Sequence, residues 1–168
     1  MENLHRRLQG SWRDVFFGGI AVLVIIADQL TKWWIRSSIA LGDVLVDKGF
    51  VQIIRIENSG ASFGILRGHT SLIIAAVFVE MVIILAAVYL LRKRLSFLDS
   101  MPMRIGAGLI FGGAIGNQVD RLVFGSVTDF VDFKVWPAFN VADASAVVGT
   151  IIVVYCIIFL SGIGKRKA

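Results

Sequence analysis

Residues 125–143 read G-S-V-T-D-F-V-D-F-K-V-W-P-A-F-N-V-A-D, and the rest of the chain is best understood around them. Three carboxylates lie in this stretch: Asp129, Asp132 and Asp143. Asp143 stands at the start of a long apolar run, and the other two lie in the short segment before it. Ionisable groups at the edge of a membrane span are costly unless they pair or take part in function. We therefore expect the rest of the chain to hold these carboxylates at one face of a bilayer.

The composition is that of a membrane protein. Of 168 residues, 57% are hydrophobic and 17% are charged, whereas soluble domains are about 25% charged. We expect one membrane-embedded domain over residues 1–168. The net charge of +5 is read as a topology signal, and no RNA-binding motif is present, so no nucleic-acid partner is expected. The single cysteine, Cys156, excludes a disulfide within one chain.

Four apolar stretches are long enough to cross a bilayer, which requires about 20 helical residues. They are residues 15–36, 70–91, 103–122 and 141–162. The third carries Gly108, Gly112 and Gly116 at intervals of four, a pattern that lets helix backbones approach closely in membranes. The expected fold is an all-α membrane protein of four transmembrane helices.

The first apolar stretch follows basic residues and therefore also resembles a signal peptide. Ser38-Ile39-Ala40 even has the small-x-small form of a cleavage site. The apolar run is too long for the core of a signal peptide, however, and Asp28 and Lys32 interrupt its end. An uncleaved first helix is the better interpretation.

Basic residues predict the orientation of the bundle. They gather before the first span, between the second and third, and after the fourth, at Arg6, Arg7, Arg13, Arg92, Lys93, Arg94, Arg104, Lys165, Arg166 and Lys167. With four spans these clusters share one side, which the positive-inside rule assigns to the cytoplasm. Both termini are then cytoplasmic.

The opposite, outer side carries a long connection in which residues 43–66 suggest β-structure. Residues 44–46 and 50–57 suit two strands joined by a turn at 47–49. Ile54 and Ile56 alternate with Arg55 and Glu57, as in a sheet with one apolar face. A small extracytoplasmic hairpin could lie on lipid or cradle a substrate; a solvated loop is the alternative.

Topology brings most of the polar residues to one depth. The outer ends of the first, third and fourth spans, with the loop before the fourth, carry Asp28, Asn117, Asp120, Arg121, Asp129 and Asp143. A site at the outer membrane interface is therefore predicted. Glu80 is the exception, because it falls near the middle of the second span.

Few kinds of chemistry fit these residues. The only histidines, His5 and His69, are far apart in the chain, which argues against a metal site and against a Ser-His-Asp triad. A Ser-Lys dyad is harder to exclude, since Lys32 lies at the polar depth. Two nearby carboxylates can share a proton, so that one activates water while the other polarises a carbonyl.

Five motifs, in this order, make the chain resemble the lipoprotein signal peptidase (signal peptidase II) family. They are Asp28-Gln29-x-x-Lys32, residues 58–63 (N-S-G-A-S-F), residues 112–121 (G-G-A-I-G-N-Q-V-D-R), residues 127–130 (V-T-D-F) and residues 139–143 (F-N-V-A-D). The resemblance implies a membrane aspartyl endopeptidase of the bacterial inner membrane, with its active site at the outer face. It implies removal of the signal peptide from a prolipoprotein, just before the diacylglyceryl-modified cysteine.

The resemblance also implies roles for individual residues. The catalytic pair falls on Asp129 and Asp143. The supporting or substrate-binding positions are Asp28, Asn58, Gly60, Asn117, Asp120, Arg121 and Asn140. Lipid-modified prolipoproteins and membrane lipid are the implied partners, with no cofactor or metal, and a monomer is expected. Ser59, Ser62 and Gln118 depart from the family's usual residues.

Several alternatives stay open. Asp28 and Lys32 could form a simple helix ion pair or support the site. Asn58 and Asn140 could hold substrate, orient the aspartates or cap loops. Asp132 is expected to face away from Asp129, because odd spacing in a strand reverses the face. At the level of the whole protein, a proton or cation transporter and a non-catalytic scaffold compete with a protease.

Overall fold

The computed structural model describes residues 2–60, 70–91 and 95–160. Its elements, in order, are α1 (Glu2–Ser38), β1 (Val44–Asp47), β2 (Gln52–Asn58), α2 (Thr70–Leu91), η2 (Ser96–Asp99), α3 (Met101–Phe124), β3 (Val127–Asp132), α4 (Val141–Tyr155) and the π-helical η3 (Cys156–Leu160). The expected bounds of the second helix are confirmed, and α3 is two residues longer at each end. α1 is the main departure, because it begins at Glu2 and continues through the basic N-terminal segment.

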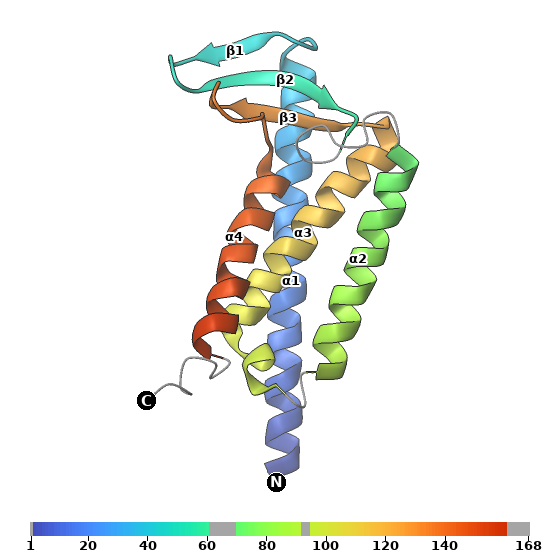
Figure 1. Ribbon diagram of the computed structural model, residues 1–168, viewed down its shortest axis with the longest axis vertical. Helices are drawn as coiled ribbons and strands as arrows, with labels where there is room; N and C mark the ends of the chain where they lie inside the picture. Colours follow the sequence, from blue (N-terminus) through green and yellow to red (C-terminus); the bar gives the residue numbers. More distant parts are fainter. Residues whose placement is uncertain (1, 61–69, 92–94, 161–168) are drawn as a thin grey trace.

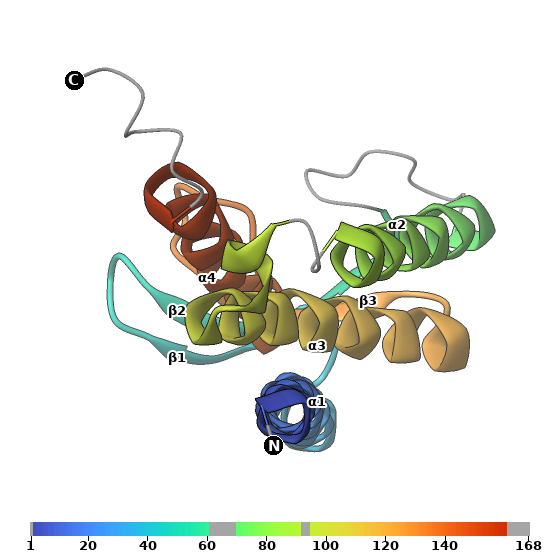
Figure 2. The same ribbon diagram turned by 90° about the horizontal axis from the view of Figure 1, so that it is seen from below.

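The four long helices run side by side, and the sheet covers one end of the bundle (Figure 1). The start of α1, η2 and the end of α4 lie at the other end (Figure 1). Seen from below, α3 lies between α1 on one side and α2 and α4 on the other (Figure 2). This central position lets α3 connect residues from every other helix.

The glycines of α3 explain how closely the helices approach. A Cβ atom built on Gly112 would lie 2.7 Å from the backbone oxygen of Ala21, and one on Gly108 would lie 2.9 Å from that of Phe17. Gly113 faces α4 in the same way, at Ala142. The repeated small residues therefore form the contact surface that the sequence predicted, against α1 and α4 at once.

The predicted hairpin is confirmed, and the structure adds a strand to it. β1 pairs with β2, and β3 completes an antiparallel sheet of order β1-β2-β3. The turn places Gly49 at φ +80°, and the Gly49 N–H donates to Asp47 Oδ1 at 2.8 Å. β3 comes from the stretch before α4, whose pairing with β2 was not predicted from the sequence. Residues 61–66 of the expected β region lie outside the described residues.

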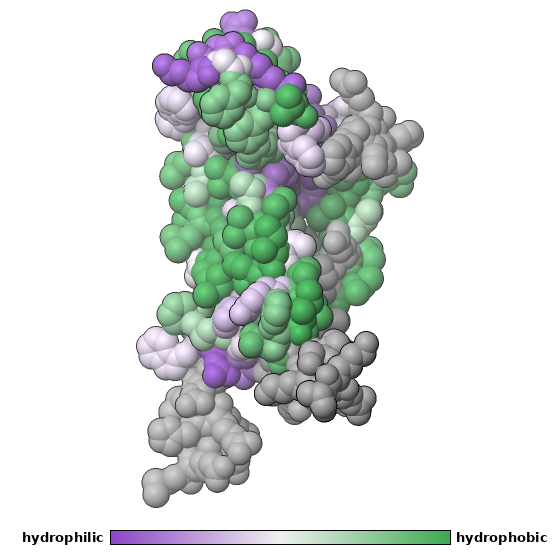
Figure 3. All heavy atoms as spheres, turned by 60° about the vertical axis from the view of Figure 1, so that its left-hand side comes forward, coloured by the Kyte–Doolittle hydropathy of each residue, from purple (hydrophilic) through white to green (hydrophobic). Residues whose placement is uncertain are grey.

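Within the part of the chain that the structure describes, two helices are long and apolar enough to cross a membrane by length and composition. They are Trp12–Ser38 and Val141–Leu160, and only 17% and 11% of their most apolar windows is buried. On the face that Figure 3 shows, apolar side chains cover much of the helices, and polar side chains gather at the end that carries the sheet. Four membrane spans stay a prediction.

Candidate active site

Asp129 lies on β3, with its residue only 3% exposed. The pairing of Ile56 with Asp129 brings the end of β2 alongside it. Asn58 Nδ2 then donates to Asp129 Oδ2 at 3.1 Å, and Asn140 Nδ2 donates to Oδ1 at 2.8 Å. Both oxygens of this buried carboxylate therefore have an amide donor.

Asp143 lies in the first turn of α4, where a capping box forms. Asn140 is the N-cap: its Oδ1 accepts from the Asp143 N–H at 3.0 Å, and its own N–H donates to Asp143 Oδ2 at 3.2 Å. Such reciprocal caps satisfy helix donors that have no partner within the helix. Asn117 Nδ2, from α3, donates to Asp143 Oδ1 at 2.8 Å. The capping box at the start of α4, together with Asn117, thus orients the carboxylate of Asp143.

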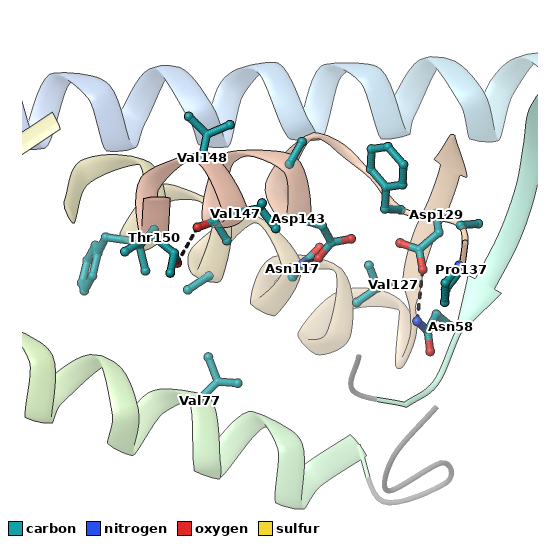
Figure 4. A pocket seen from close by; sticks show the side chains of 18 of the residues that line it. Asn58, Val77, Asn117, Val127, Asp129, Pro137, Asp143, Val147, Val148 and Thr150 are labelled. Atoms are coloured by element: carbon teal, nitrogen blue, oxygen red, sulfur yellow. Dashed lines mark hydrogen bonds between the residues drawn. The ribbon is translucent and has the colours of Figure 1, made fainter. Parts of the chain in front are cut away.

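Asn140 joins the two aspartates into one unit. It is 1% exposed, and its side chain bonds Asp129 through Nδ2 and the backbone of Asp143 through Oδ1. Figure 4 shows Asp143 beside Asn117, and Asp129 bonded to Asn58. The contacts of Asn58 and Asn140 agree with the alternatives of orienting the aspartates and of capping, because Asn140 is also the helix N-cap and Asn58 Oδ1 also accepts from the Gly60 N–H at 3.0 Å.

The surroundings of Asp129 favour its protonated form. Burial raises the pKa of Asp129 to about 7, and the nearby charge of Asp143 adds to the shift. Hydrogen bonds from Asn58 and Asn140 and the charge of Lys32 work in the opposite direction without cancelling it. A carboxyl group with such a pKa can give and take a proton near neutral pH.

Asp132 has a different environment, as expected from its spacing. It is half-buried and accepts from Gln52 Nε2 and from the Lys134 N–H, both at 2.7 Å. The side-chain amides of Asn117 and Asn140 instead donate to Asp143 and Asp129. Asp132 therefore serves the sheet and its adjoining loop rather than the pair.

A buried ionic cluster lies behind the pair. Asp28 and Lys32, both fully buried, form an ion pair of 2.8 Å, and Lys32 lies 3.4 Å from Asp120. Asp28 Oδ1 accepts from the Ala142 N–H at 3.0 Å, next to Asp143. Asp28 and Lys32 thus form the helix ion pair, and Asp28 in addition bonds the backbone next to Asp143.

Asp120 and Arg121, near the end of α3, both bond groups outside that helix. Asp120 accepts from the Thr128 N–H at 3.0 Å and pairs with Arg36 at 3.3 Å, which ties β3 to α3 and α1. Arg121 Nη2 donates to the Gly60 backbone oxygen at 3.2 Å. Ser62 and His69 lie outside the described residues, as does the side chain of Glu80.

Gln29 and Arg36 are supporting residues that the sequence did not predict, and Lys32 was predicted only as the partner of Asp28. Lys32 Nζ donates to Asn117 Oδ1 at 2.8 Å, and Gln29 Nε2 bonds both Asp28 and Asp120. Arg36 reaches Thr128 Oγ1 at 3.0 Å. The signal was the spacing, because positions 28, 32 and 36 recur every four residues and lie on one face of α1.

A cleft of about 1690 Å³ leads to the aspartates. Its walls come from α2, α3 and α4, and Val77 of α2 lies across it from Val147 and Thr150 of α4 (Figure 4). Asp129 and Asp143 line one end, and the rest of the lining is mainly apolar. Among the described residues, no group of three or more His, Cys, Asp or Glu could hold a metal ion. The arrangement can receive an extended apolar ligand whose polar end meets two carboxylates.

Comparison with known proteins gives a consistent result. The sequence model of the family described as signal peptidase (SPase) II matches residues 20–159. Lipoprotein signal peptidase of Dehalococcoides mccartyi strain CBDB1 is 42% identical over 76% of this chain and 79% of its own length. That of Moorella thermoacetica is 37% identical over 88% and 96%.

Solved structures agree. A bacterial membrane enzyme structure superposes with a TM-score of 0.70 at 34% identity, covering 88% of this chain and 89% of the other. A second superposes with a TM-score of 0.66 at 33% identity, covering 83% and 90%. With the matching motifs and the family match over most of its length, the chain belongs to the lipoprotein signal peptidase (signal peptidase II) family.

Proposed function

We propose that this protein is a membrane aspartyl endopeptidase in which Asp129 and Asp143 activate a water molecule. It removes the signal peptide from prolipoproteins by cutting just before the diacylglyceryl-modified cysteine. It works as a four-span monomer of the bacterial inner membrane, with both termini in the cytoplasm and the site at the outer face. Family membership already makes it a protease of prolipoprotein signal peptides; the catalytic pair, the cut position and the topology are the proposal.

One observation carries the proposal: Asn140 holds both aspartates at the end of an apolar cleft. Its side chain bonds Asp129, and its capping box orients Asp143. The charge of Asp143 raises the pKa of Asp129, so the pair favours holding one proton between its two carboxylates. The raised pKa of Asp129, about 7, makes it the group that carries this proton near neutral pH.

The reaction then needs only water and the two side chains. Asp143 takes a proton from water as the water oxygen bonds the scissile carbonyl carbon, while Asp129 gives its proton to the carbonyl oxygen. When the tetrahedral intermediate collapses, the oxygen returns its proton to Asp129 and the leaving nitrogen takes the proton held by Asp143. The carbon–nitrogen bond breaks, and one water has been consumed.

The cleft suits the substrate that the family implies. A signal peptide has an apolar core of about 7–15 residues, and the long apolar walls from α2 and α4 offer it a matching surface. Around the pair the cleft is lined by polar side chains such as Asn58, Asn117 and Arg121, while the ion pair of Asp14 and Arg104 lines it near the starts of α1 and α3. The cleft would therefore hold the apolar core and present its polar end to the aspartates.

The test is cleavage of a lipidated precursor by purified protein, followed by sizing of the products. Asp129→Asn and Asp143→Asn should each lower the rate to background, because each removes either the shared proton or the base. Asp132→Asn is the matched control from the same strand and should keep most of the activity. Full activity in either of the first two variants would reject the pair.

A further inference from the structure

Lys32 is a buried cation that the reaction above does not use directly. Its side chain has no exposed surface, and Nζ lies 2.8 Å from Asp28 Oδ2 and 3.4 Å from Asp120 Oδ2. Nζ also donates to Asn117 Oδ1 at 2.8 Å. An ammonium group has three donors and no acceptor, so these oxygens take up its whole capacity. Lys32 can therefore act on the site only through the residues it contacts and through its charge.

The first route leads through Asn117 to the side chain of Asp143. Asn117 turns Oδ1 to Lys32, and its Nδ2 donates to Asp143 Oδ1 at 2.8 Å. A cation stabilises only the carbonyl side of an amide, so Lys32 favours the orientation with the NH₂ group towards Asp143. Asn140 Nδ2 donates to the same Asn117 oxygen at 3.0 Å and favours the same orientation.

The second route leads through Asp28 to the backbone beside Asp143. Asp28 pairs with Lys32 through Oδ2 and accepts the Ala142 N–H through Oδ1 at 3.0 Å. Ala142 is fully buried in the first turn of α4, immediately before Asp143. The side chain and the backbone of Asp143 are thus both held by partners of one cation.

We propose that Lys32 is a positioning residue of the reaction. Through Asn117 and Asp28 it fixes the carboxylate of Asp143 in the orientation that accepts a proton from the attacking water. This inference rests on the proposed function above. A fully buried charge is costly even when paired, and a role in aligning the base gives a reason for a lysine here. Its charge also opposes the effects of burial and of Asp143 on the pKa of Asp129.

The experiment uses charge-neutral pairs, because removing Lys32 alone leaves Asp28 buried without its counter-ion. Lys32→Met/Asp28→Asn removes the ammonium group but keeps an oxygen at position 28 for the Ala142 N–H. Lys32→Gln/Asp28→Asn restores an NH₂ donor towards Asn117 without the charge. Asp28→Asn alone is the control. For each purified full-length variant, kcat, KM and the pH profile of kcat/KM are measured with lipidated precursor, together with thermal unfolding.

We expect kcat of the Met variant to fall by ~10²-fold relative to Asp28→Asn, which is the loss that a misplacement of about 1 Å can cause. KM should change little. The Gln variant should regain much of kcat. In both double variants the limb of the pH profile set by Asp129 should move to higher pH, because a positive charge that favours its ionised form is missing.

Three results would overturn the proposal. The Met variant could keep its kcat and pH profile and lose only thermal stability, which would make Lys32 structural. KM could rise with kcat unchanged, which would make it a binding residue. The Met and Gln variants could have equal kcat, which would exclude the route through Asn117. If the Met variant does not fold, the pH profile of the Gln variant tests the proposal. A shift to higher pH would support it, and an unchanged profile would overturn it.

Asp143→Asn in the same assay separates this inference from the proposed function. An active Asp143→Asn variant rejects the catalytic pair itself. An inactive Asp143→Asn variant beside a fully active Met variant rejects only the role of Lys32.

Discussion

Asp129 shows how surroundings set the chemistry of a single residue. The chain contains three aspartates between residues 125 and 143, and they are chemically identical in the unfolded state. In the structure, Asp129 is buried beside Asp143, whereas Asp132 is half-buried at the edge of the sheet, bonded to Gln52. Burial disfavours the ionised form of a carboxyl group. The pKa of Asp129 is therefore raised above the value of a free aspartate side chain.

The raised pKa of Asp129 predicts a pH dependence of stability. The pKa is about 7 in the folded protein against 3.8 for the free side chain, so the folded state binds this proton more tightly than the unfolded state. Its contribution to the free energy of unfolding is fully present below about pH 4 and is lost as pH rises towards 7, by at most ~1.4 kcal/mol per pH unit. Asp129→Asn removes this titration.

Thermal unfolding in detergent between pH 5 and pH 8 measures the effect. We expect the unfolding temperature of wild type to fall relative to that of Asp129→Asn as pH rises. A difference between the two proteins that is the same at every pH does not affect this comparison. Asp132→Asn should follow wild type. Parallel curves for wild type and Asp129→Asn would contradict the assigned pKa.

At the scale of elements, α3 places the site because its small residues remove the space between backbones. Gly108 and Gly112 lie against α1, and Gly113 lies against α4. Close approach brings Asn117, near the end of α3 that meets the sheet, within hydrogen-bond distance of Lys32 and of Asp143. A shift of one helix by the width of a methyl group would separate these partners.

We therefore predict that Gly112→Ala is harmful and that Gly19→Ala is not. A Cβ on Gly112 would lie 2.7 Å from the backbone oxygen of Ala21, whereas nothing lies within 4 Å of one on Gly19 in α1. Overpacking of this kind costs ~1–3 kcal/mol, and alanine otherwise favours a helix over glycine by ~1 kcal/mol.

Unfolding temperature and cleavage rate are measured for both variants. Gly112→Ala should lower both values, and Gly19→Ala should leave cleavage unchanged with equal or higher stability. Equal behaviour of the two variants would show that close α1–α3 packing does not control the site.

For the whole molecule, the proposed topology predicts which positions a membrane-impermeant thiol reagent reaches in intact cells. Lys48→Cys in the hairpin and Val135→Cys, at a residue 92% exposed, should react from outside. Lys93→Cys and Arg166→Cys should react only after the membrane is opened. Labelling at position 93 from outside would invert the bundle and move the site to the cytoplasm.

The position of the site at one end of an apolar cleft predicts a dependence on lipid. Each buried CH₂ contributes ~0.8 kcal/mol to membrane anchoring, so two acyl chains hold the modified cysteine at the interface and the bond before it near the aspartates. A precursor without lipid should be cut far more slowly than the matched diacylglyceryl form, as initial rates in bilayers would show. Equal rates would mean that peptide sequence alone is recognised.

Periodicity and motif order were enough to predict much of this protein. Apolar runs of about 20 residues predicted the four long helices, since a helix must satisfy its backbone groups within the apolar phase. The glycine repeat predicted close packing, and alternation predicted the hairpin. The motifs pointed to Asp129, Asp143 and the residues that now lie beside them. The side chains of one site must come together in space, whichever helix or strand each of them lies on.

The tertiary structure alone decided how these residues connect. The pairing of β3 with β2, the double role of Asn140 and the contacts of Lys32 join positions that are up to 114 residues apart, as in the bond from Ala142 to Asp28. Such bonds depend on distances of about 3 Å between separate elements. A pattern along one chain records which face a side chain occupies but not its distance to a partner on another element, so only the folded arrangement shows which carboxylate is buried and what holds it.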